Sequence, residues 1–289
     1  DTRSLLQSGR VNFVLTIPSG FSKAWVRGEK PSLLLEADAT DPAAAAMAVA
    51  QIKPIVDRTL ADIQIGSLDY LKPKPSSITT LVHNKYNPEG ISQFNIVPGL
   101  LGVILTMTMV MITSIAMTRE AERGTMENLL AMPSKPLEVM IGKITPYVLM
   151  GLVQTMIILL ASNMLFHLPF VGSGSTFGLG VGLFILANLA IGFTFSTIAK
   201  SQMQAMQLTF FFFLPSMLLS GFMFPFQGMP KWAQYLGEIL PLTHFLRIVR
   251  GIMLKGTSLS LLSNEFLALL AILIIVGIIA MLRYRQTLD

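Results

Sequence analysis

A dense cluster of charges follows the first long apolar stretch of the chain. Residues 119–130 contain two arginines and three glutamates and end on two leucines, and Pro133 lies just beyond them. This pattern predicts a helix of about three turns that the proline terminates. Arg123 and Glu127 stand four positions apart and can pair on one face, which contributes roughly a few tenths of a kcal/mol when exposed. Solvation of a connecting loop is the simplest interpretation, but a loop that serves topology alone has little need of three acidic groups on the side where basic residues are favoured.

Residue types that perform catalysis or hold metals are scarce in this sequence. The absence of cysteine excludes disulfides, thiolate metal sites and cysteine nucleophiles. The three histidines, His83, His167 and His244, lie far apart, without the paired spacing of a zinc site or a catalytic base. The sequence also has no phosphate-binding glycine loop with lysine and no nucleophile elbow. We therefore expect no catalytic residue, no metal site and no cofactor in this chain.

The overall composition favours a membrane protein. Of the 289 residues, 52% are hydrophobic and 13% are charged, whereas about a quarter are charged in soluble globular proteins. The net charge of +5 does not indicate nucleic-acid binding, because the basic residues either mix with acidic ones before residue 95 or flank apolar stretches. We expect no nucleic-acid partner.

Five apolar stretches are long enough to cross the hydrocarbon core as helices, which takes about 20 residues each. They are residues 97–117, 139–166, 177–198, 203–223 and 266–282. We therefore predict a mainly α fold: a polytopic helical membrane protein with five spans and a small α+β external domain. Pro146 and Pro215 should kink the second and fourth spans. Gly178 and Gly182 either mark a tight helix contact or reflect the frequency of glycine in membrane helices.

Residues 1–95 have the pattern of the external domain, and residues 96–289 form the transmembrane domain. Residues 11–17 and 32–36 read as strands, and residues 21–27 as two helical turns between them. Asp41-Pro42 starts a helix with apolar positions from Ala45 to Ile63, since aspartate caps the first turn and proline tolerates it. This apolar stripe serves either as domain core or as a subunit contact.

Basic residues at the ends of the spans set the orientation. Lys200, Arg283, Arg285 and the first inter-span loop fall on one side, which should be the cytoplasm, as should the C-terminus. Residues 1–95 and the loop 224–265 then lie outside, although four basic residues in that loop oppose the assignment. Because an external domain before the first span must itself be exported, we expect a further N-terminal helix and six spans in the complete subunit.

The charged segment resembles the first cytosolic loop of the permease subunits of type-2 ABC exporters, in the bacterial multidrug or efflux-like branch with an external domain. The resemblance extends over nearly the whole chain. It implies a coupling helix over residues 119–132 that inserts into a groove of a separate nucleotide-binding subunit. The residues it assigns to this contact are Arg119, Glu120, Glu122, Arg123, Gly124, Thr125, Glu127, Leu129 and Leu130. Ala121 stands where a basic residue is frequent in that family.

A second match follows the fourth span, where prolines divide the chain into helices too short to span. The resemblance implies a helical hairpin over residues 224–256 that dips into the outer leaflet near the exit of the translocation path. Its residues are Pro225, Met229, Pro230, Trp232, Pro241, Thr243, His244, Arg247 and Arg250. Thr243 should cap a helix with Phe245, Ile248, Val249 and Ile252 on its apolar face. The cationic side chains either meet an anionic group of substrate or lipid, or anchor the hairpin by snorkelling.

The resemblance further implies a permease, half of a dimer, in the bacterial inner membrane. It would move an amphipathic, lipidic or drug-like substrate outward by alternating access, and the ATP and magnesium would be bound by a separate ATPase subunit. The expected partners are ABC ATPase subunits, a second identical or paralogous permease, membrane lipid and, as a further candidate, a periplasmic adaptor. A mechanotransmitter that acts on an external protein without transport is the main alternative, and a channel or receptor without an ATPase is another.

Overall fold

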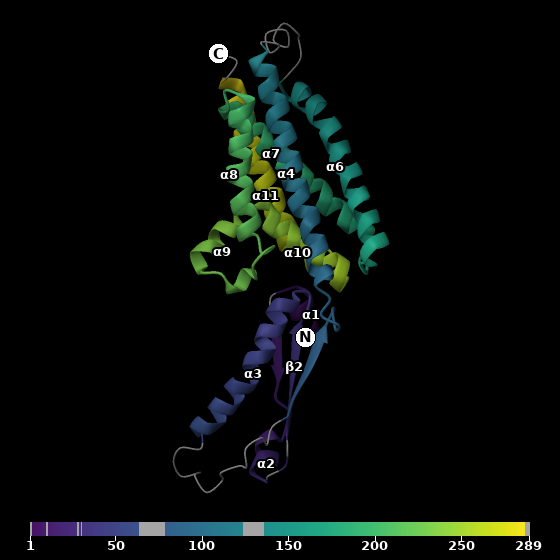
Figure 1. Ribbon diagram of the computed structural model, residues 1–289, viewed down its shortest axis with the longest axis vertical. Coiled ribbons are helices and arrows are strands. Elements are labelled where there is room, and N and C mark those ends of the chain that lie inside the picture. Colours follow the sequence, from purple (N-terminus) through teal and green to yellow (C-terminus); the bar gives the residue numbers. More distant parts are fainter. Residues whose placement is uncertain are drawn as a thin grey trace. The chain divides into compact units, whose positions relative to one another are not determined.

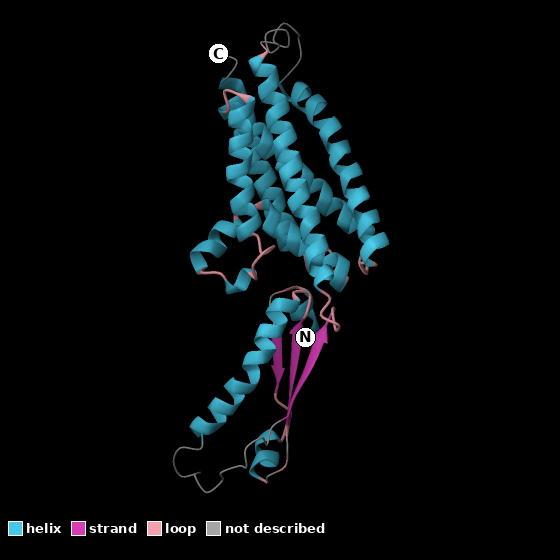
Figure 2. Ribbon diagram, in the orientation of Figure 1, coloured by secondary structure: helices cyan, strands magenta, loops and turns pink. Residues whose placement is uncertain are grey.

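The computed structural model describes residues 2–9, 11–27, 29, 31–63, 79–123 and 136–286. The chain divides into two compact units, Asp1–Asn95 and Ile96–Asp289. Helices make up most of the described chain, and the strands belong to the first unit (Figure 2). The predicted class, a mainly helical membrane protein with a small α+β part, is confirmed.

The first unit combines a three-stranded sheet with three helices among its described residues. In chain order these are α1 Thr2–Gln7, β1 Phe13–Thr16, α2 Phe21–Val26, β2 Ser32–Asp38, α3 Pro42–Ile63 and β3 Thr79–Lys85. The strand order is β1-β2-β3, with β1 antiparallel and β3 parallel to β2. The predicted strands and helices are confirmed as β1, α2, β2 and α3, whereas α1 and β3 were not predicted.

Asp41 starts α3 as the sequence indicates. Its Oδ1 accepts from the backbone N–H of Ala43 at 3.1 Å and of Ala44 at 3.2 Å. Along the apolar stripe Ala45 is buried, but Val49, Ile52 and Val56 are only half-buried. The start of the stripe therefore belongs to the domain core. The half-buried residues further along are accessible for the alternative, a subunit contact.

The second unit consists of helices among its described residues. They are α4 Ser92–Glu122, which begins just before the unit, then α6 Pro136–Phe166, α7 Gly174–Ile198, α8 Gln202–Leu219, the 3-10 turn η2 Phe226–Gly228, α9 Lys231–Glu238, α10 Pro241–Lys255 and α11 Ser263–Gln286. Within the described chain, α4, α6, α7 and α11 are long and apolar enough to cross a membrane.

The predicted span 203–223 corresponds to α8, which is shorter than predicted and is not among those four helices. Gln202, Gln204 and Gln207 make its first half polar. It ends at Leu219 because Gly221 adopts a φ of 85°, which a right-handed helix cannot continue. The prediction of five spans is thus met by four helices, with α8 as a fifth helix that falls short. Pro146 and Pro215 lie inside α6 and α8.

Helix α7 is the most buried of the four long helices and contacts α6, α8, α10 and α11. It approaches α4 closely at Gly192, where an added Cβ would lie 2.6 Å from the carbonyl oxygen of Val110. A Cβ at Gly178 or Gly182 would meet nothing within 4 Å. The contact proposed for that glycine pair is therefore absent from the described part of this chain, and the tight contacts lie at Gly180, against Ile248, and at Gly192.

Candidate functional site

The segment after α8 folds into two short helices, as its prolines predict. Pro230 precedes α9, Pro241 occupies the first turn of α10, and Gly256 ends α10 with a φ of 61°. Thr243 was expected to cap α10, and this is wrong, since Leu240 holds that position. The Thr243 hydroxyl instead donates to the carbonyl oxygen of Gly237 at 2.6 Å and ties α10 to the end of α9.

Helix α10 is buried along nearly its whole length by other parts of the second unit. The predicted apolar face, Phe245, Ile248, Val249 and Ile252, is fully buried. The Phe245 ring stacks on Phe184 of α7 with centroids 3.9 Å apart. By contrast, α9 exposes one face, on which Trp232 and Tyr235 are 66% and 71% accessible. The two helices of the hairpin therefore differ: α10 is part of the protein core, and α9 covers the surface.

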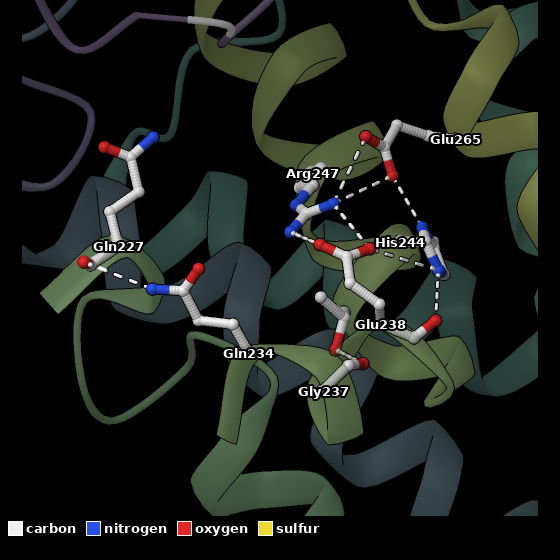
Figure 3. A network of polar contacts seen from close by, with 8 residues as sticks. Gln227, Gln234, Gly237, Glu238, His244, Arg247 and Glu265 are labelled. Carbon is white, nitrogen blue, oxygen red and sulfur yellow. Dashed lines mark hydrogen bonds and ion pairs between the residues drawn. The ribbon is translucent and has the colours of Figure 1, made fainter. Parts of the chain in front are cut away.

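Four charged side chains from α9, α10 and α11 meet in one cluster, drawn in Figure 3. His244 Nδ1 lies 2.6 Å from Oε2 of Glu265, and its Nε2 lies 2.9 Å from the carbonyl oxygen of Glu238. Arg247 donates to Glu238 Oε1 at 2.6 Å and to Glu265 Oε1 at 3.3 Å. We call these four residues the charged cluster. It fastens three helices of the second unit to one another.

The balance of charges in the cluster favours a protonated histidine. Burial opposes a charge on His244, but the hydrogen bonds to Glu265 and to the Glu238 carbonyl, with the negative charge of Glu265, raise its pKa above the ordinary value. With His244 protonated, two cations face two carboxylates. The Arg247 guanidinium also lies 4.6 Å from the centre of the Phe226 ring, which makes a cation–π contact.

The cluster corrects the expectation for the basic residues of the hairpin. His244 and Arg247 pair with carboxylates of this chain, so neither an external anion nor snorkelling is needed to explain them. Arg250 donates from Nη1 to the carbonyl oxygen of Gly221 at 3.1 Å, which joins α10 to the end of α8. Sequence reasoning missed Glu238 and Glu265. They are the two acidic residues between positions 224 and 265, and that count could have indicated partners for the basic ones.

The inner charged segment is described for its first five residues. Arg119, Glu120 and Glu122 lie in the last turn of α4, which runs on from the first span without a break, and Arg123 follows it. Gly124, Thr125, Glu127, Leu129 and Leu130 lie outside the described residues.

Two carboxylates of this segment have partners on other helices. Glu120 forms an ion pair with Lys143 of α6. Glu122 accepts from the backbone N–H of Gln202 at 2.8 Å and from its side-chain amide at 2.5 Å, at the start of α8. These hydrogen bonds lower the pKa of Glu122. Arg119 and Arg123 are exposed.

Polar side chains inside the long helices form hydrogen bonds within this chain. Gln154 Oε1 of α6 lies 2.9 Å from the Thr108 hydroxyl of α4, so it bonds two helices. Asn188 Nδ2 donates to the carbonyl oxygen of Phe184 within α7. In the part of the chain that the structure describes, no group of three or more histidines and carboxylates is placed to hold a metal ion.

This architecture defines a class: a helical membrane protein in which two short helices, one buried and one exposed, connect α8 to the last long helix. Residues 1–282 match the family described as ABC-2 family transporter protein, so the chain belongs to that family and is a permease of the ABC transporter type.

Similar proteins are found in bacteria and in a eukaryote. The probable multidrug ABC transporter permease YbhR of Escherichia coli K12 is 29% identical over 99% of this chain and 76% of its own length. The inner membrane transport permease YhhJ of the same strain is 32% identical over 98% of this chain and 75% of its own length. ABC transporter G family member 20 of Dictyostelium discoideum is 27% identical over 72% of this chain and 29% of its own length.

Proposed function

We propose that this chain is the membrane-spanning subunit of an ATP-driven exporter. Membership of the ABC-2 family over residues 1–282 is the observation that carries the proposal. The name of YbhR speaks of a multidrug transporter permease, and we extend that role to this chain. The substrate class we propose is amphipathic, lipidic or drug-like, moved outward by alternating access.

The driving force comes from separate ATPase subunits, which bind ATP and magnesium, so this chain is not itself an enzyme. In our proposal the contact to those subunits lies within residues 119–132. Arg119 and Arg123 at the inner end of α4 are exposed, so their side chains are available for such a contact. A second permease, identical or paralogous, completes the translocation path, and a periplasmic adaptor is a further candidate partner.

The main test is transport by the full-length protein with its ATPase subunit in vesicles. We expect Glu127→Lys to lower ATP-dependent substrate movement by roughly tenfold or more, because a reversed charge sets like charges against each other at a contact. Glu89→Lys, at an exposed position of the first unit, serves as the matched control and should transport normally.

Two outcomes would contradict the proposal. If no ATPase subunit accompanies the purified protein, the ABC coupling is wrong for this chain. If ATP hydrolysis proceeds and responds to Glu127→Lys but no substrate moves, the chain is a mechanotransmitter that acts on an external protein, which the size of the first unit would accommodate.

The orientation we propose places residues 1–95 and the connection from α8 to α11 outside the inner membrane, and the C-terminus in the cytoplasm. Because the chain has no cysteine, single cysteines report their side without background. In intact cells a membrane-impermeant maleimide should label Glu89→Cys and Ser258→Cys but should label Arg123→Cys only after the membrane is opened. All three positions are exposed. Labelling of Arg123→Cys in intact cells would show that the proposed orientation is inverted.

A further inference from the structure

We propose that Glu120 and Glu122 are positioning residues that clamp the inner end of α4 to α6 and α8, rather than contacts to the ATPase subunit. This inference rests on the proposed function, in which the segment after α4 receives the motion of the ATPase. The resemblance assigned both glutamates to the ATPase groove. Their partners in the structure are on neighbouring helices of the same chain.

The helix geometry explains why two acidic residues stand two positions apart. Successive residues of an α-helix are about 100° apart around the axis, so Glu120 and Glu122 are about 200° apart and face nearly opposite sides. Figure 1 shows α4 between α6 and α8 at this end of the second unit. One carboxylate therefore reaches α6 and the other reaches α8. In the sequence the two glutamates look unpaired because their partners, Lys143 and Gln202, are 23 and 80 residues away.

The Glu120–Lys143 pair is the stronger half of the clamp. The Lys143 and Glu120 side chains are 17% and 36% exposed, so water screens this pair less than a surface pair. Lys143 pairs its ammonium group with the Glu120 carboxylate. It is positioned near the start of α6, so the pair closes the loop that joins α4 to α6.

Glu122 completes the clamp with a two-point contact. Its two oxygens accept separately from the backbone and the side chain of Gln202, which fixes the direction of the carboxylate. The backbone N–H of Gln202 belongs to the first turn of α8, where unsatisfied N–H groups and the helix dipole favour an anion.

The clamp links the coupling segment mechanically to three helices, α4, α6 and α8. Residues 124–135 connect α4 directly to α6, and the two glutamates tie the end of α4 to the beginnings of α6 and α8. A displacement imposed on the segment is then passed to all three helices together. Without the clamp, the same displacement would be lost in bending of the last turn of α4.

The test is a charge exchange in the complete transporter with its ATPase subunit. We expect Glu120→Lys and Lys143→Glu each to lower the substrate moved per ATP hydrolysed by roughly fivefold, the scale of a typical coupling between two sites. The double variant, Glu120→Lys with Lys143→Glu, should restore most of this ratio, because the pair is re-formed with opposite polarity. If the double variant stays as low as Glu120→Lys alone and loses its ATPase subunit on purification, Glu120 contacts the ATPase and the proposal is overturned.

A second measurement keeps the clamp testable if transport itself fails. The melting temperature of the solubilised chain, taken for Glu120→Gln, Lys143→Met and the two together, reports the pair without any partner. We expect each single variant to lower the melting temperature and the second substitution to add little. Strictly additive losses would mean that the two side chains do not interact. Absence of ATP-driven transport in the wild-type protein would instead refute the proposed function, while this thermal cycle would still decide the clamp.

Discussion

Gly192→Val is expected to prevent the long helices of the second unit from packing. The first atom of the new side chain would lie 2.6 Å from the Val110 carbonyl oxygen and 3.0 Å from Cβ of Thr113, both on α4. Val110 and Thr113 are fully buried, and a backbone carbonyl cannot rotate away as a side chain can. Helix α7 would have to separate from α4 along this face. Such overpacking typically costs about 1–3 kcal/mol, and we expect the upper end of this range here and a sharp loss in the yield of monodisperse protein in detergent, because the clash is with backbone.

The same helix supplies the matched control for this variant. A Cβ at Gly182 meets nothing within 4 Å, so Gly182→Val adds the same side chain to α7 without a clash inside this chain. Its yield and its melting temperature should stay close to those of the wild-type protein. Equal damage from both substitutions would show that valine in α7 is harmful in itself, and a stable Gly192→Val protein would disprove the close approach of α4 and α7.

The glycines of α7 also illustrate what a sequence pattern cannot decide. Gly178 and Gly182 have the spacing of a tight membrane contact, yet within α7 the close approaches are at Gly180 and Gly192. Spacing along one helix identifies a smooth face. Which helix covers that face depends on how all the helices pack together. That packing cannot be predicted from the spacing of residues in one sequence.

Elements governed by local physics were the ones that the sequence predicted best. Hydropathy located the four long helices, and the capping aspartate located the start of α3. The strand β3 was missed because its place in the sheet depends on parallel pairing with β2, across a connection that includes α3. Helix α8 was overestimated because a run of phenylalanines masks its polar first half.

The charged residues show the same difference between what local sequence determines and what the tertiary fold determines. The basic residues of the hairpin were recognised as noteworthy from their types, but their partners were not. Glu238 and Glu265 lie far apart in the sequence, and they share His244 and Arg247 as partners only because α9 and α11 both pack beside α10. Long-range pairing of this kind follows from the tertiary fold. A count of charges can indicate that pairing is required, but it does not say which groups pair.

Glu265→Gln should weaken the second unit more than Glu238→Gln, because the Glu265 carboxylate is the less exposed and lies closer to His244, at 2.6 Å against 3.7 Å for the Glu238 carboxylate. Its side chain is 23% accessible, against 41% for Glu238. Removing one partner of a buried pair costs about 3–5 kcal/mol, and partial exposure reduces this to roughly 1–3 kcal/mol here. Thermal unfolding of the solubilised protein at pH 6 should show the loss, with Glu238→Gln as the comparison.

The pH dependence of the loss separates an electrostatic role for Glu265 from a packing role. The folded state raises the pKa of His244, so its pairing with Glu265 stabilises the protein fully below the ordinary histidine value of 6.5, and this contribution is lost as the pH rises through the raised pKa. The wild-type melting temperature should therefore fall over that interval. In Glu265→Gln the charge that holds the proton is gone, and burial, which opposes protonation, dominates. We expect the fall to vanish, as it should in His244→Gln, whereas an unchanged pH profile in both variants would mean that His244 stays neutral and the cluster is held by Arg247 alone.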